Sequence, residues 1–152
     1  MNAPLPHVDL MRVRPPRGSR PRIRPHQFLR WCRRADLGAL RAAVWTVRAC
    51  RRIHRSEGAR GLHPPRLPRV PQVSKRAVSA VDLVLWLRAE HCLVSTSVRQ
   101  AWLAAHGAAQ DVVIGVAIEP PGELRAHAWL AGEPDGGVGY EEIVRVPPSR
   151  RT

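Results

Sequence analysis

The first half of the chain carries apolar residues at helical spacing among arginines. Between residues 28 and 53, large apolar side chains recur three, four or six positions apart, and arginine fills many positions between them. The stripe consists of Phe28, Trp31, Leu37, Leu40, Val44, Val47 and Ile53. This period predicts one amphipathic helix, or two that meet near residues 36–38, ending near Gly58 or Gly61.

Two more helices are expected in the middle of the chain. Ser74 is a residue type that caps helices, and a broad apolar stripe follows it over residues 78–87. A third helix is expected over residues 91–107, where the final glycine offers a left-handed exit.

Beyond the helices the apolar period falls to two. Alternating residues predict strands over 112–118 and 124–130, joined by the Pro-Pro-Gly turn at 120–122. The segment 133–137 is expected to be a hairpin turn that leads into a third strand within 138–146. Helices followed by an antiparallel meander predict an α+β fold.

Charge is distributed unevenly along the 152 residues. The formal net charge is +13, but residues 1–76 contain 19 Lys and Arg with 3 acidic residues, whereas residues 77–152 contain 6 and 9. A basic chain of this kind favours nucleic acid as a partner, because phosphates attract clustered arginines. Here the excess belongs to one half only.

Composition and pattern together divide the chain into four parts. Residues 1–25 are dense in proline and arginine and are expected to be a flexible basic arm. Residues 26–74 are an arginine-rich helical region with a proline-rich linker, residues 75–146 are the folded core, and residues 147–152 are a tail.

The cysteines and the apolar segments indicate a cytoplasmic protein. Cys32, Cys50 and Cys92 cannot all pair, no CxxC occurs, and the N-terminus lacks the apolar stretch of a secretory signal. The longest apolar stretches, 83–87 and 112–118, are far shorter than the roughly 20 residues of a membrane-spanning helix. We therefore expect a reducing compartment and no membrane partner.

Cys92 and His127 are the candidate catalytic pair. A thiol at a helix N-terminus lies where unpaired N–H groups favour the thiolate, which is the nucleophilic form. A histidine on a neighbouring strand would accept the thiol proton and later protonate a leaving amine. The alternative interpretation is an ordinary buried thiol and a strand histidine with a structural role.

A third group would orient the histidine. If the third predicted strand pairs with the second through a tight turn, Glu142 shares the face of His127 and Glu141 takes the other face. A bulge would favour Glu141 instead, whereas Asp135 suits the turn itself and Glu133 precedes it. Glu142 is the first candidate, and an exposed strand end is the alternative.

No cofactor is expected. His91, Cys92 and His106 do not have the spacing of a zinc site, because adjacent residues on a helix point in different directions. The sequence has no nucleotide-binding glycine-rich motif.

Several segments of the second half occur in an order that is typical of one family. They are Cys92-Leu93-Val94-Ser95-Thr96, a helix ending at Gly107, the strand from Val112 to Val116, Arg125-Ala126-His127-Ala128-Trp129-Leu130, and residues 139–146. Taken together over residues 75–146, they resemble the lasso peptide biosynthesis B proteins, which are transglutaminase-like leader peptidases.

The resemblance implies a papain/transglutaminase-like cysteine protease core. Cys92 would attack the scissile carbonyl of the leader peptide, His127 would act as base and then as acid, and water would release the acyl-enzyme. Trp129 would line the substrate site. The family usually has aspartate as the third residue and often a basic residue just after the nucleophile, where this chain has Val94-Ser95.

The resemblance also implies partners. Nothing in the sequence looks like the small leader-recognition domain, so the chain resembles the stand-alone peptidase half of a split B protein. It would process a lasso precursor peptide with a separate leader-binding protein and pass the core peptide to an ATP-dependent, asparagine-synthetase-like macrolactam synthetase. The basic half is then expected to contact an acidic surface of the partner, the leader, or both.

A nucleic-acid-binding protein without enzymatic activity is the alternative function. In that case arginines between Arg12 and Arg76 would follow phosphates, and binding would weaken steeply with salt. The ordered set of Cys92, His127 and Trp129 in the neutral-to-acidic half favours the peptidase.

Overall fold

The computed structural model describes residues 36–57, 66–74, 77–120, 122–134 and 136–148. Its elements, in chain order, are α2 (Leu37–Glu57), α3 (Val78–Leu87), α4 (Cys92–Ala105), β1 (Val112–Glu119), β2 (Glu123–Leu130) and β3 (Glu141–Val146). The proposed basic arm, residues 1–25, lies outside the described residues, and so do Phe28, Trp31 and Cys32 at the start of the predicted helical region. Three helices followed by a small antiparallel sheet confirm the predicted α+β class.

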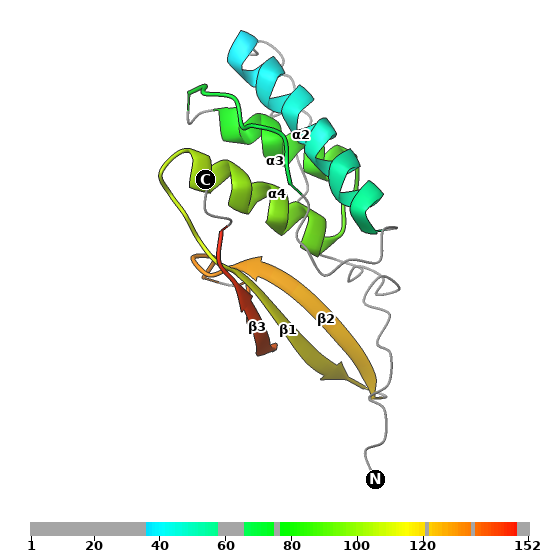
Figure 1. The fold of residues 1–152 in the computed structure, drawn as a ribbon. Coiled ribbons are helices and arrows are strands. Elements are labelled where there is room, and N and C mark those ends of the chain that lie inside the picture. The colour runs from blue at the N-terminus through cyan, green and yellow to red at the C-terminus, as the bar shows by residue number, and fades with distance from the viewer. Residues whose placement is uncertain (1–35, 58–65, 75–76, 121, 135, 149–152) are drawn as a thin grey trace, which may run out of the picture.

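The helices and the sheet form a layered stack (Figure 1). Helix α4 contacts β1 and β2 on one side and α2 and α3 on the other, while α2 and α3 contact no strand. Helix α4 therefore contributes to two apolar clusters. Its inner side packs with α2 and α3, and its opposite side packs with the sheet.

Two tryptophans centre the helical layer. Trp45 of α2 and Trp102 of α4 are 4% and 2% exposed, and their ring centroids lie 5.5 Å apart. Helix α2 begins after Asp36, whose Oδ1 accepts a hydrogen bond of 2.7 Å from the Ala39 N–H. This is the N-cap geometry that satisfies a free helical N–H group.

The segment 66–74 crosses α2 in an extended conformation, without helix or strand. The indole Nε1 of Trp45 donates to the Pro68 carbonyl at 3.1 Å, and Val70 is buried at 4% exposure. The part of the proline-rich linker that the structure describes is therefore packed against the helices.

The sheet order is β2-β1-β3, so the predicted meander is wrong in one respect. Strand β1 is central and pairs antiparallel with both neighbours, whereas β2 and β3 do not pair. The expected hairpin at 133–137, and the register derived from it, do not form. Strand β1 buries Val112 and Val113 at 3% and 1% exposure, and the connection 131–140 is long enough to carry the chain past β1 to its far edge.

The two edges of the sheet differ. The outer side of β2 is held by side chains, because the Ala128 carbonyl accepts from Thr96 Oγ1 and the Leu130 N–H donates to Glu133 Oε2. Among the described strands, β3 has no partner on its outer side, and Ile143 is 60% exposed. No helix within the described ranges is long and apolar enough to span a bilayer.

Candidate functional site

Cys92 is the first residue of α4. The preceding residue, His91, has an extended backbone (φ −63°, ψ 154°), and its side chain makes no hydrogen bond that caps α4. The thiol is free and half-buried, and it packs beside the small cluster of Val112, Ala128 and Leu130. A cysteine here lies at the positive end of the helix dipole, as the sequence analysis expected.

A buried carboxylate fixes the turn before Cys92. The Glu90 side chain is 4% exposed and bonds to Arg88 Nε at 2.6 Å and to His54 Nε2 at 2.7 Å. Burial alone would raise the pKa of Glu90, but these hydrogen bonds outweigh it and hold the pKa below its ordinary value. Because His54 belongs to α2, this cluster ties the turn to the first helix. Ala89 in the same turn has a left-handed backbone (φ 48°), which is costly for alanine.

The second described cysteine provides a contrast. Cys50 is fully buried in α2, and burial, aided by the charge of Glu90, raises the pKa of its thiol to about 11. A thiol with this pKa stays protonated near neutral pH, so Cys50 is not a candidate nucleophile.

Helix α4 is fastened to the strand that carries the histidine. Thr96, one turn after Cys92 on the same helical face, is 6% exposed and donates to the Ala128 carbonyl at 3.0 Å. Arg99 continues this contact with ion pairs to Asp82 (3.1 Å) and Glu133. These bonds place the N-terminal turn of α4 over β2.

His127 lies on the other face of β2. Side chains alternate along a strand, so Ala128 and Leu130 face α4, whereas His127 and Trp129 point away. The imidazole stacks on Trp129 with ring centroids 6.0 Å apart, and it contacts the tilted ring of Tyr140 with centroids 5.1 Å apart. Burial lowers the pKa of His127 below its ordinary value, and the negative charge of Glu133 opposes that shift.

Glycines allow Trp129 to pack flat on this outer face. A Cβ on Gly115 of β1 would lie 2.7 Å from Trp129 Cη2, and one on Gly136 would lie 2.7 Å from Trp129 Cβ. The indole is therefore enclosed between the sheet and the connection after β2, and it is 8% exposed. Trp129 packs beside the His127 imidazole on this face, and its place beside a substrate stays a prediction.

The acidic candidates take different positions. Glu142 lies opposite Gly115, which lies opposite His127, so a β-bulge after Ile114 brings Glu142 to the histidine face by a register that was not expected. Two hydrogen bonds from Arg145, at 2.9 and 2.7 Å, engage Glu142 and hold its pKa below its ordinary value.

The other three candidates differ from Glu142. Glu133 is the acidic residue whose charge acts on His127, although it is paired with Arg99. Glu141 lies one row further along, opposite Val116, and Asp135 lies outside the described residues.

The structure brings His127, Trp129 and Glu142 to one face of the sheet and Cys92 to the other. Within the described ranges, no hydrogen bond joins the Cys92 thiol to the His127 imidazole. No group of three or more His, Cys, Asp or Glu side chains in the same ranges is arranged to hold a metal ion.

Two features of the site were not foreseen from the sequence. The Glu90 cluster joins residues 36 positions apart, and nothing in the sequence marks His54 as its partner. Tyr140 packs with its ring tilted against both His127 and Trp129. It is the single tyrosine of the chain, and that was the only signal the sequence offered.

Comparison with known families agrees with this architecture. Residues 33–144 match the model of the Transglutaminase-like superfamily, and the chain belongs to that superfamily. The superfamily commonly comprises cysteine proteases and transglutaminases, which supports an enzyme with cysteine chemistry. No curated protein and no solved structure matches the chain significantly.

Proposed function

We propose that this protein is a cysteine peptidase that removes the leader peptide from a lasso peptide precursor. One observation supports this above the others. In a chain of the Transglutaminase-like superfamily, a half-buried cysteine begins α4, and α4 is bonded to the strand that carries His127 and Trp129.

The proposed reaction has two steps. The Cys92 sulfur attacks the scissile carbonyl while its proton passes to His127, which then protonates the leaving amine of the core peptide. Water, deprotonated by His127, hydrolyses the thioester and releases the leader as a carboxylate. Glu142, or Glu133 in its place, would orient the imidazole.

Cys92 and His127 lie on different faces of β2. We therefore infer that the two side chains come together only when the precursor and the leader-binding partner bind. Bringing the His127 imidazole to the face of Cys92 requires a change of register or twist in β2, an edge strand that pairs with β1 alone among the described strands. The core peptide would then pass to an asparagine-synthetase-like macrolactam synthetase, with both reactions in the cytoplasm.

Mass spectrometry of the precursor tests the chemistry. In the presence of the leader-binding partner, the wild-type chain is expected to release the leader, and Cys92→Ala and His127→Ala are each expected to slow release by about a thousandfold or more. Cys50→Ala is the matched cysteine control and should retain activity. Wild-type rates in either of the first two variants would refute the proposal.

A further inference from the structure

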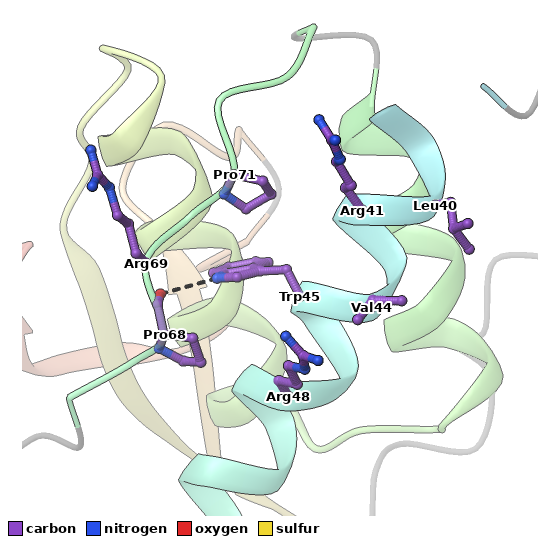
Figure 2. Close-up of a pocket in the computed structure, with 8 residues that line it drawn as sticks. All are labelled: Leu40, Arg41, Val44, Trp45, Arg48, Pro68, Arg69 and Pro71. Carbon is purple, nitrogen blue, oxygen red and sulfur yellow. Dashed lines mark hydrogen bonds between the residues drawn. The ribbon is translucent and has the colours of Figure 1, made fainter. Parts of the chain in front are cut away.

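A groove on the first half of the molecule is not used by the proposed chemistry. It has a volume of about 350 Å³ and lies between α2 and the extended segment 66–74 (Figure 2). Trp45, Pro68 and Pro71 form its floor, and Leu40 and Val44 extend it along the helix.

The floor is rigid and apolar. Figure 2 shows the indole of Trp45 between Pro68 and Pro71, with Nε1 directed at the Pro68 carbonyl 3.1 Å away. Proline restricts its own backbone, so this wall keeps its shape without an occupant. Leu40 and Val44 are 59% and 43% exposed, which leaves apolar surface open beside the floor.

Three arginines surround this floor. Arg41 and Arg48 project from α2 and Arg69 from the opposite wall, and all three are exposed. In the part of the chain that the structure describes, none of the three has an ion pair with a carboxylate.

The arginines of the second half differ from these three. Arg88, Arg99, Arg125 and Arg145 each pair with at least one acidic side chain of this chain. The groove therefore presents cationic groups whose partners the described residues do not supply.

We propose that this groove binds an acidic segment of another protein, with carboxylates on the arginine rim and an apolar side chain over the floor. Arginine pairs with carboxylates through two parallel hydrogen bonds, which suits the rim. An apolar anchor in a preformed pocket bordered by charges is typical of a protein interface. Nucleic acid would use the rim but would leave the apolar floor without a partner.

The basic arm of this chain does not fit as the occupant. Residues 1–25 contain six arginines and a single acidic residue, Asp9, so the arm carries the same charge as the rim. We take the protein that supplies this acidic segment to be the leader-binding partner, and that identification rests on the proposed function. Peptide binding itself can be measured without cleavage.

Fluorescence anisotropy with the full-length chain tests the groove. The probe is a labelled ten-residue peptide of glutamates and aspartates around a central leucine. The groove triple variant Arg41→Glu/Arg48→Glu/Arg69→Glu is expected to weaken its binding at least about tenfold, because three ion pairs become repulsive contacts. The control triple Arg51→Glu/Arg52→Glu/Arg55→Glu makes the same charge change at exposed α2 positions outside the groove. It should weaken binding clearly less than the groove triple, because these three side chains do not line the groove.

The floor is tested separately. Leu40→Ser/Val44→Ser should weaken binding of the leucine peptide and leave a serine-substituted peptide unaffected. Circular dichroism of each variant checks that the fold is retained.

Three results would overturn the inference. The first is an equal loss of binding in the control triple. The second is that a DNA duplex binds the wild-type chain more tightly than the peptide does, and that the groove triple variant loses this DNA binding. The third is a self-associated chain that the groove triple dissociates, since the occupant would then be a second copy. Cys92→Ala should bind the peptide as the wild-type chain does. Failure of the proposed cleavage can therefore be told apart from failure of peptide binding in the groove.

Discussion

The two faces of the sheet are built differently. The face toward α4 buries Ala128 and Leu130 at 4% and 2% exposure, and hydrogen bonds from Thr96 and Gln100 of α4 to strand carbonyls add to its apolar contacts. The outer face holds a half-buried imidazole, an indole and a phenol ring. One face provides packing and carries the candidate nucleophile, whereas the other carries the candidate base. The backbone of β2 separates them, so any catalytic encounter involves a change in this strand.

The largest expected effect concerns the space under the indole of Trp129. Gly115→Val should destabilise the protein by about 2–3 kcal/mol, because its Cβ would lie 2.7 Å from Trp129 Cη2 and 2.6 Å from the Glu141 carbonyl oxygen. Urea unfolding measures this loss. A double-mutant cycle with Trp129→Leu is the control, since the smaller side chain should relieve part of the clash. Strict additivity would show that the indole does not rest on Gly115.

The bond between α4 and β2 should contribute less. Thr96→Val removes the hydroxyl bonded to the Ala128 carbonyl and should cost about 1–3 kcal/mol, because a buried acceptor loses its partner. Thr46→Val is the matched control: its hydroxyl bonds to the Ala42 carbonyl within α2, a group that can also accept from the helix backbone. Its expected cost is below about 1 kcal/mol. Equal costs would mean that Thr96 does not join the layers in particular.

The outer face of the sheet should make the stability of the protein depend on pH through the protonation of His127. Its folded-state pKa is lowered, so the unfolded chain binds protons more tightly, and stability should fall as pH drops through the ordinary histidine range near about 6.5. Unfolding followed across that range should show a smaller decrease for His127→Gln. The same slope in both proteins would contradict a depressed pKa. In nuclear magnetic resonance, Glu133→Gln should lower the His127 pKa further, because it removes the opposing negative charge.

The smallest effect on stability is expected at Glu142. Its ion pair with Arg145 is exposed, so Glu142→Gln should leave the free energy of unfolding nearly unchanged. If Glu142 orients His127 during cleavage, the same change should lower kcat about tenfold or more with little effect on KM. Glu133→Gln is measured beside it. A loss of kcat in Glu133→Gln alone would assign the third role to Glu133.

The sequence predicted the elements better than their arrangement. The α2 stripe, the Cys92 start of α4 and the alternating residues of β1 and β2 are local signals, and the structure has helices and strands there. The pairing of β3 with β1 is a long-range choice, which no local period encodes and which the length of the connection 131–140 allows. Glu142 is an example. The predicted hairpin was wrong, but the observed bulge also places Glu142 on the face of His127.

The candidate site divides in the same way. The position of Cys92 at the start of a helix followed from sequence pattern alone. The same is true of the position of Trp129 two residues after His127 on one strand face. The contact of His127 with Tyr140, and the joining of Glu90 to His54, depend on tertiary packing that no local period encodes. The peptidase roles of Cys92, His127 and Glu142 stay predictions.

The unequal edges of the sheet limit how copies of this chain associate. Side chains already occupy the outer backbone groups at Ala128 and Leu130 of β2, so a strand from another molecule would find donors and acceptors free along β3 instead. Two copies joined through β3 would be related by a two-fold axis, because each copy offers the same strand. In such a dimer the end of β2 at Ala128 and Leu130 would stay covered by its own side chains, which hinders addition of a further strand there.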